Sequence, residues 1–322
     1  MHCELVVPGL LGNGAAPRLA ALELLLARGR RKADDAQPAE DWVRASFELG
    51  DGPFPAGALT VLAFGGNPGT DTWMRADPVH LRVMHDRLVV VPAEALEVSS
   101  DEARALCDGL NAHFAGMEFT AFEARRWCAR LTVSIAIDAG HPLESAGREA
   151  APPAHAAALL NEMQMALHAH PVNAAREARG EPPVNSVWLW GAGRSPRARC
   201  PWQSVAADDP AVLGAALLAG ARHRALPRSA GEWLERLPED GRHLAWLDVL
   251  RAPLALAPES VPAALEALER DWFGPLLAAL RSGRIGMATL YVPDGAQAVS
   301  FETVRGDLRR FWRRPKPIMH YA

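Results

Sequence analysis

The hydrophobic positions of this chain follow two alternating patterns. Short apolar runs are typical of strands, and longer stretches carry apolar residues at every third or fourth position, as helices do. The expected strands are Leu5–Val7, Leu59–Phe64, Leu131–Ile137, Val184–Trp190, His243–Val249 and Ile285–Val292. The expected helices are Arg18–Ala27, Ser100–Phe114, Pro153–His170 and Pro262–Leu280. This alternation predicts an α/β fold with a mostly parallel sheet flanked by helices.

Two polar stretches interrupt the pattern. Gly29–Pro55 is expected to be a surface excursion, and Ala139–Pro153, rich in Ala, Gly and Pro, a loop. A chain of 322 residues is long enough for one large domain or two packed ones. We expect a single composite domain over 1–322 with a smaller lobe at roughly 71–150, and two tandem domains are the alternative.

Composition narrows the class of protein. The formal net charge is −4, so the molecule as a whole is not a polycation, and nucleic acid is not the expected partner. No apolar run reaches bilayer-spanning length, so no membrane association is expected. The first residues lack a basic segment ahead of an apolar one, which predicts no signal peptide. Four scattered cysteines without a C-x-x-C pair fit a reducing cytoplasm.

The segment from Leu160 to Gly193 has the clearest candidate chemistry. Pro171 should end the preceding helix at His170, which places Asn173 and Arg176 in the turn that follows. A strand after Asn185 should then present Trp188 and Trp190 on one face. Gly191 and Gly193 would leave open backbone at the carboxyl end of that strand, where open α/β sheets bind ligands. Asn and Arg side chains with free N–H groups suit a phosphate or carboxylate. The structural alternative is a helix-to-strand corner, and spacing alone favours it.

This segment resembles the archaeal-type branch of the cofactor-independent phosphoglycerate mutases. The resemblance rests on His170-Pro-Val-Asn173-Ala-Ala-Arg176, on Pro183-Val-Asn185 and on a strand that ends Gly191-Ala-Gly193. A second block, Arg75-Ala76-Asp77 followed by Asp86-Arg87, is similar to that family's Arg-Ala-Asn and Asp-Arg-Arg blocks. Such a resemblance implies an alkaline-phosphatase-like core with a smaller inserted lobe.

A closer resemblance is to proteobacterial proteins labelled phosphoglycerate mutase-like or RpfE-type regulatory proteins. Their Ala-Asp-Pro-Val-His-Leu signature stands here at Ala76–Leu81, Asn-Glu-x-Gln-Met at Asn161–Met165, and Asn-Ser-x-Trp-x-Trp-Gly at Asn185–Gly191. The resemblance implies a set of ligand-binding residues: Arg75, Asp77, His80, His170, Asn173, Arg176, Asn185, Trp190, Gly191 and Gly193. A solvated turn at Asp77 and His80 is the structural alternative.

The departures from the family concern its metal ligands. Enzymes of this superfamily hold two divalent metals with Asp and His side chains. The first strand here runs into Pro8-Gly9. The family's Asp-x-x-Gly-His signature keeps only its first Asp, in Asp248-Val-Leu-Arg251-Ala252. The last strand ends Asp294-Gly295 in place of Asp-His. Asp248 and Asp294 alone make a poor site for a hard cation. We therefore expect no bound metal and no other cofactor.

A basic aromatic segment lies near the C-terminus. Arg309, Arg310, Arg313, Arg314 and Lys316 flank Phe311-Trp312, a composition that suits nucleic acid or a protein partner. Because the net charge argues against a large nucleic-acid footprint, a docked terminal helix with a solvated face is the structural alternative, and it is preferred.

Three functions follow, in this order. The first is a non-catalytic or regulatory phosphoglycerate mutase-like protein that binds a small phosphorylated metabolite. An active metal-dependent mutase or phosphatase is the alternative. A protein-interaction module with a Trp-rich surface is the third.

Overall fold

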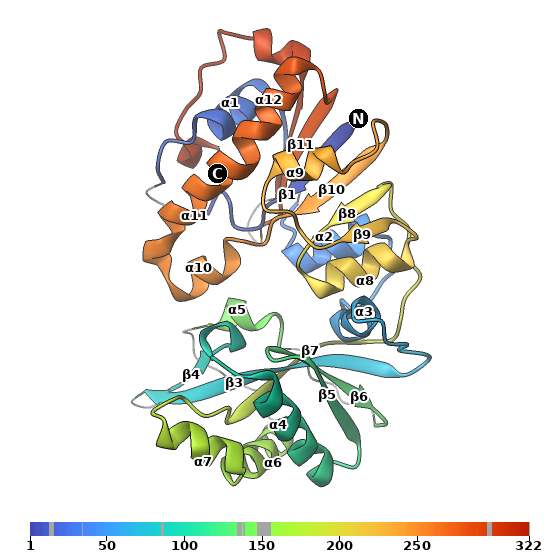
Figure 1. Cartoon of the computed structure of the whole chain (residues 1–322), viewed down its shortest axis with the longest axis vertical. Coiled ribbons are helices and arrows are strands. Elements are labelled where there is room, and N and C mark those ends of the chain that lie inside the picture. The colour runs from blue at the N-terminus through green and yellow to red at the C-terminus, as the bar shows by residue number, and fades with distance from the viewer. Residues whose placement is uncertain are drawn as a thin grey trace. The chain divides into compact units, whose positions relative to one another are not determined.

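The computed structural model describes residues 1–12, 16–33, 35–84, 87–133, 137, 139–146, 156–294 and 298–321 (Figure 1). Internal contacts divide the chain into two compact units. The first unit comprises Met1–Gly50 and Arg197–Ala322, and the second unit comprises Asp51–Pro196. The lobe predicted at 71–150 falls within the second unit. No helix in the described part of the chain is long and apolar enough to cross a membrane.

The first unit is built on a seven-stranded sheet with the order β2-β12-β11-β1-β10-β8-β9. Its strands are β1 His2–Val6, β2 Arg30–Ala33, β8 Ser204–Ala206, β9 Arg222–Arg224, β10 Arg242–Trp246, β11 Met287–Val292 and β12 Val299–Val304. The five strands from β11 to β9 are parallel, and β12 and β2 run antiparallel beside them. The prediction of a mostly parallel sheet is therefore confirmed for this unit.

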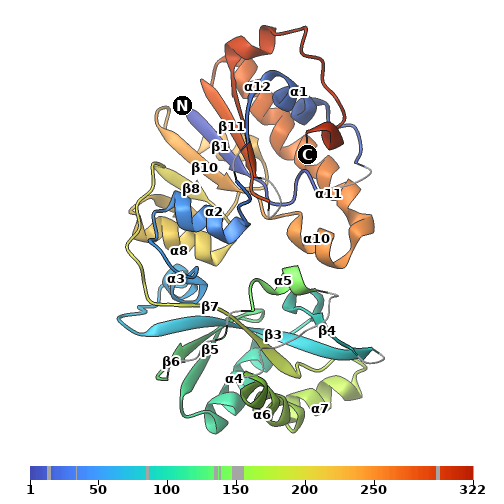
Figure 2. The same cartoon turned by 180° about the vertical axis from the view of Figure 1, so that it is seen from behind.

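Helices lie on both faces of that sheet (Figures 1 and 2). They are α1 Ala20–Arg28, α2 Ala39–Ser46, α8 Pro210–Leu218, α9 Ala230–Glu235, α10 Arg251–Leu256, α11 Val261–Leu268 and α12 Gly274–Ser282. The main core lies on the face that carries Leu5, Ala245 and Leu290, where side chains of α1, α9, α11 and α12 pack. Short 3-10 turns span Pro258–Ser260, Arg305–Arg309 and Ile318–His320.

The helix predicted at Pro262–Leu280 is interrupted by a π-helical turn. This turn, Glu269–Phe273, joins α11 to α12 and buries Trp272 and Phe273. Pro275 lies in the first turn of α12, and its ring cannot donate the backbone hydrogen bond that a continuous α-helix requires. The π-helical turn before Pro275 accommodates this missing hydrogen bond.

The prediction that Gly29–Pro55 is a surface excursion is wrong. This stretch contains β2 and α2, and α2 buries Trp42 and Val43. The Trp42 ring lies 5.9 Å from that of Trp246 and 5.4 Å from that of Tyr291, so α2 covers the second face of the sheet with an aromatic layer. Several charged residues around these apolar positions had obscured the helical spacing.

The second unit has a separate sheet, whose strands pair antiparallel with one another in the described part of the chain. Its strands are β3 Thr72–Met84, β4 Arg87–Val91, β5 Met117–Glu123, β6 Arg126–Leu131 and β7 Ser186–Gly193. β3 pairs with β6 and β4 at its two ends and with β7 along its other edge. The prediction of a mostly parallel sheet does not hold in this unit, where two hairpins replace the βαβ crossovers that parallel strands need.

One face of this sheet carries the core of the second unit. Side chains of Met74, Trp127 and Leu189 pack there with those of α4 and α6. The helices of the unit are α3 Ala56–Ala63, α4 Ser100–His113, α5 Pro142–Ser145, α6 Ala157–His168 and α7 Pro171–Ala178, with a 3-10 turn at Ala93–Ala95. α4 begins at a capping box in which the Ser99 side chain accepts from Glu102 N and the Glu102 carboxylate accepts from Ser99 N.

Two predicted strands are corrected here. Leu59–Phe64 lies in α3, a short buried helix whose residues are apolar on every side, so periodicity alone could not separate helix from strand. The strand expected at Leu131–Ile137 ends at Leu131 as β6, and residues 134–136 lie outside the described part of the chain.

Candidate functional site

The predicted ligand corner lies between α7 and the start of β7. α6 ends at His168, two residues before the predicted end at His170. Pro171 then begins a new helix, α7, with His170 as its N-cap. Asn173 and Arg176 are therefore helical residues and not part of a turn. Both are buried, with 1% and 0% of their surfaces exposed.

The Asn173 amide joins three backbone groups of its own unit. Its Nδ2 donates to Leu167 O and to Val184 O, both at 2.8 Å, and its Oδ1 accepts from Val184 N at 2.9 Å. The bonds reach the end of α6 and Val184, two residues before β7. Asn173 thus fixes the spacing of two helices and a strand.

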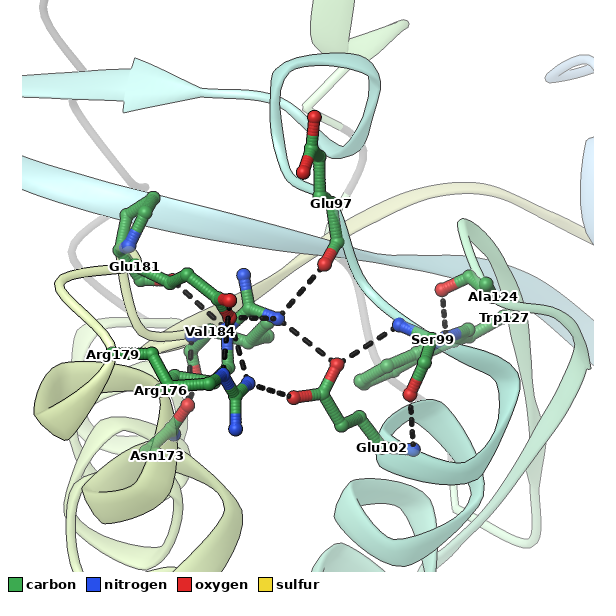
Figure 3. Close-up of polar contacts among 11 residues, drawn as sticks. Glu97, Ser99, Glu102, Ala124, Trp127, Asn173, Arg176, Arg179, Glu181 and Val184 are labelled. Carbon is green, nitrogen blue, oxygen red and sulfur yellow. Dashed lines mark hydrogen bonds and ion pairs between the residues drawn. The ribbon is translucent and has the colours of Figure 1, made fainter.

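Arg176 is held in the same way (Figure 3). Its Nε donates to Pro182 O at 3.0 Å, and its Nη1 donates to Glu97 O and to Glu102 Oε2, each at 3.0 Å. Arg179 also reaches Glu102, with its Nη2 2.7 Å from Oε1. Figure 3 shows both guanidinium groups converging on Glu102 from α7.

Glu102 is the acidic centre of this group. Its burial favours the neutral carboxyl, but the bonds from Ser99 and Arg179 and the charge of Arg176 outweigh burial and lower the pKa of Glu102 below its ordinary value. The carboxylate links the first turn of α4 to α7. In the described part of the chain, Asn173 and Arg176 contact backbone carbonyls, a backbone N–H and carboxylates of the protein, as the structural alternative requires.

The other residues of the predicted corner make similar contacts. His170 Nδ1 accepts from Val172 N at 3.2 Å as the cap of α7. Asn185 exchanges two hydrogen bonds with the backbone of Leu81, at 2.7 and 3.0 Å. His80 Nδ1 donates to Pro183 O at 2.9 Å, which also ties β3 to the segment before β7.

Gly191 and Gly193 were predicted to leave open backbone after an inner strand, and this prediction is wrong. Both belong to β7, which in the described part of the chain pairs with β3 alone. A Cβ at Gly191 would lie 2.5 Å from that of Ala56, and one at Gly193 would lie 2.6 Å from that of Pro55. These glycines allow α3 and the residue before it to pack directly on the strand.

A second group of predicted residues does come together, on the face of the sheet opposite α4. Arg75 and Asp77 on β3 form a buried ion pair, with Nε of Arg75 3.1 Å from Oδ1 of Asp77. Trp190 Nε1 donates to the other oxygen of Asp77 at 2.7 Å. The Arg75 guanidinium also lies over the Trp190 ring, 5.5 Å from its centroid.

Two further segments border this cluster. Arg75 Nη1 lies 3.4 Å from Thr60 Oγ1 on α3, and the His141 ring meets the Trp190 ring edge-on at 5.0 Å. Trp188 Nε1 donates to Gly140 O at 2.9 Å, so Trp188 and Trp190 share one face, as predicted.

The positions where the resemblance places the family's metal ligands lie after β1, β10 and β11 of the first unit. Asp248 follows β10, and its Oδ1 lies 3.3 Å from Nε of Arg251. Nη1 of Arg251 lies 2.7 Å from Oε1 of Glu40 on α2. The methyl carbon of Leu254 occupies the space beside Gly9, where a Cβ would approach it to 2.5 Å. We refer to Asp248, Arg251 and Glu40 as the ion triad.

Arg251 keeps its charge in this setting. Its burial opposes the charged form, but Asp248, Glu40 and Asp209 together raise the pKa of Arg251 above its ordinary value. The residues present do not fit a two-metal centre, since two of the available carboxylates bind a guanidinium. In the described part of the chain, no group of three or more His, Cys, Asp or Glu side chains is placed to hold a metal ion.

Sequence reasoning missed two members of the ion triad. Arg251 was read only as a residue that replaces part of a ligand signature, and Glu40 lay in the stretch predicted to be an excursion. The spacing of Trp42, Val43 and Phe47 could have revealed Glu40. This spacing predicts an amphipathic helix, and Glu40 lies in its first turn.

Comparison with known proteins gives a partial picture. No protein-family model matches the chain. A stretch of 39 residues, 12% of this chain and 10% of the other protein, is 46% identical to a probable 2,3-bisphosphoglycerate-independent phosphoglycerate mutase of Geobacter sulfurreducens. The chain thus matches about a tenth of that protein's length.

A solved structure shares the fold, and a second one aligns more weakly. The PH0037 protein from Pyrococcus horikoshii aligns with a TM-score of 0.59 at 14% identity, over 94% of this chain and 87% of that one. A cofactor-independent phosphoglycerate mutase from Thermoplasma acidophilum aligns with a TM-score of 0.44 at 17% identity, over 95% and 90% of the two chains. The first likeness shows that this mixed α/β fold extends over nearly the whole of both chains.

Proposed function

We propose that this chain is a phosphoglycerate mutase-like protein that no longer performs metal-dependent phosphoryl transfer. In this proposal it is a regulatory protein of the RpfE type with an alkaline-phosphatase-like core. It acts in the cytoplasm by binding a small phosphorylated metabolite.

The ion triad is the observation that carries the proposal. Metal-assisted phosphoryl transfer needs cations with open coordination positions, which contact the attacking and leaving oxygens. Arg251 instead offers a fixed single charge whose donors point at Asp248 and Glu40. A guanidinium neutralises carboxylates well but cannot act as a Lewis acid or lower the pKa of a bound water as a metal does.

The family assignment has independent support. The stretch of 46% identity over 39 residues is shared with a protein named as a probable mutase. The order of the Ala76–Leu81, Asn161–Met165 and Asn185–Gly191 signatures supports the regulatory subgroup. The phosphorylated ligand rests on the resemblance, and Arg75 is the cation that we assign to it, because Trp190 and His141 border it on the face that α4 does not cover.

The test combines elemental analysis with an activity assay. We expect purified protein to contain less than stoichiometric manganese, zinc or magnesium, and to leave 3-phosphoglycerate unchanged with added manganese. A cofactor-independent mutase assayed in parallel is the control. Stoichiometric metal together with turnover would establish the enzymatic alternative and overturn the proposal.

The ligand is tested separately by thermal shift with 2- and 3-phosphoglycerate. We expect stabilisation of the parent protein and a loss of that response in Arg75→Gln. If no phosphorylated metabolite raises the melting temperature, the ligand part of the proposal fails while the loss of transfer chemistry stands.

A further inference from the structure

Two large aromatic side chains protrude from the first unit. Phe311 and Trp312 are 77% and 66% exposed, and their rings meet edge-on with centroids 5.3 Å apart. The other aromatic side chains of the molecule mostly pack in its interior, as Trp42, Trp233 and Trp272 do. An exposed aromatic pair of this size usually marks a contact surface.

The backbone that carries the pair is fixed to the fold. Nη1 of Arg313 donates to Gly29 O at 3.0 Å, and Nη1 of Arg310 lies 3.4 Å from Arg28 O, both at the carboxyl end of α1. Arg310 also pairs with Asp307 at 2.8 Å. Ile318, 2% exposed, anchors the chain after the pair. The aromatic rings therefore project from an ordered support.

Cations surround the pair. From 303 to 321 the sequence has six Arg and Lys residues against one acid, Asp307, although the whole chain has a net charge of −4. β2 begins directly after Gly29 and is exposed along its length. The exposed basic residues of these two segments are Arg30, Arg31, Lys32, Arg305, Arg309, Arg313, Arg314 and Lys316. We call this set, with Phe311 and Trp312, the basic aromatic surface.

We propose that the basic aromatic surface docks on an anionic phospholipid membrane. This peripheral docking departs from the expectation of no membrane association, which rested only on the lack of a run long enough to span a bilayer. Each Lys or Arg near such a surface gains electrostatic attraction, and protruding Trp and Phe rings enter the interfacial zone of the bilayer. Single-stranded nucleic acid fits less well. Successive bases stack in parallel on aromatic faces, whereas these two rings are inclined at 81°. A bilayer interface accepts rings in either orientation.

The experiment is co-sedimentation of the full chain with vesicles. One set contains phosphatidylglycerol and phosphatidylcholine in equal amounts, and the other phosphatidylcholine alone. We expect binding to the anionic set, and weaker binding as salt is added, because screening reduces the attraction between separated charges. Arg309→Gln with Arg314→Gln should weaken binding by about 25-fold, roughly fivefold for each charge near the surface.

Matched variants separate this surface from general effects. Phe311→Ser with Trp312→Ser should reduce the affinity for anionic vesicles at least tenfold. Met165→Ser, at a side chain 74% exposed in the second unit, should leave that affinity unchanged. Arg228→Gln with Arg236→Gln removes two exposed charges elsewhere and should change binding less than twofold. All variants should keep the melting temperature of the parent, since the substituted side chains are exposed.

Three results would overturn the inference. The first is equal affinity for the two vesicle sets or no binding to either. The second is a loss of vesicle binding in Arg228→Gln with Arg236→Gln that is as large as the loss in Arg309→Gln with Arg314→Gln. The third is tighter binding of a single-stranded oligonucleotide that the aromatic double variant abolishes, which would assign the surface to nucleic acid.

Discussion

Arg251 and Glu40 are 211 positions apart in sequence, yet Nη1 of the one lies 2.7 Å from Oε1 of the other. The contact joins α10 to α2 beside the carboxyl end of β10, which Asp248 follows. It places a permanent cation among carboxylates at the positions where the resemblance predicts metal ligands.

Removing that cation should destabilise the first unit. In Arg251→Met, Asp248 and Glu40 would lose the guanidinium that offsets their burial, which costs about 3–5 kcal/mol for a fully buried pair and less here, where 12% of the side chain is exposed. Arg251→Lys should lose less, because it keeps the charge but not the planar fork. Urea denaturation of both variants measures the difference.

The same variant tests the role of the charge. We expect millimolar manganese chloride to raise the melting temperature of Arg251→Met, since two carboxylates are then available to a cation, and to leave the parent unchanged. An equal response in the parent would show that Arg251 does not take the place of a cation.

Arg176 should be essential to the second unit. Its side chain is 1% exposed and pairs with Glu102 while bonding to two backbone carbonyls. Arg176→Ala should therefore lower the free energy of unfolding by about 3–5 kcal/mol, the cost of breaking a buried ion pair. Arg179→Ala, at a side chain 47% exposed, is the control and should cost about 1 kcal/mol or less. Similar losses in both variants would contradict the structural role.

The sequence predicted the elements whose patterns are local. The 3.6-residue spacing of α4 placed that helix to within one residue, and β1, β10 and β11 were found from their apolar runs. Such local patterns do not predict which distant segments contact each other. Trp190 meets Asp77 across 113 positions, and the antiparallel order of the second sheet depends on hairpins that local periodicity does not specify.

Glu102 should make stability depend on pH. Its pKa is lower in the fold than in the unfolded chain, so the carboxylate stabilises the fold fully above the unfolded pKa of about 4.3 and loses this effect as the pH falls through its folded pKa. The difference in unfolding free energy between the parent and Glu102→Gln should be constant from pH 6 to 8 and shrink below pH 4. Asp101→Asn, at a side chain 88% exposed, is the control. A difference that does not change with pH would contradict this assignment.

Gly191 and Gly180 offer a matched pair for the packing of α3 on β7. Both have a positive φ, +62° and +76°, so alanine should cost about 1–2 kcal/mol at either position from backbone strain alone. At Gly180 a Cβ meets nothing within 4 Å, whereas at Gly191 it would lie 2.5 Å from the Cβ of Ala56 and 3.1 Å from its backbone N. Neither neighbour is a flexible side-chain end, so α3 has to move away from the strand, and overpacking of this kind adds about 1–3 kcal/mol. Gly191→Ala should therefore unfold at a lower urea concentration than Gly180→Ala. Equal midpoints would mean that Gly191 serves the backbone conformation alone, and would contradict its role in the packing of α3 on β7.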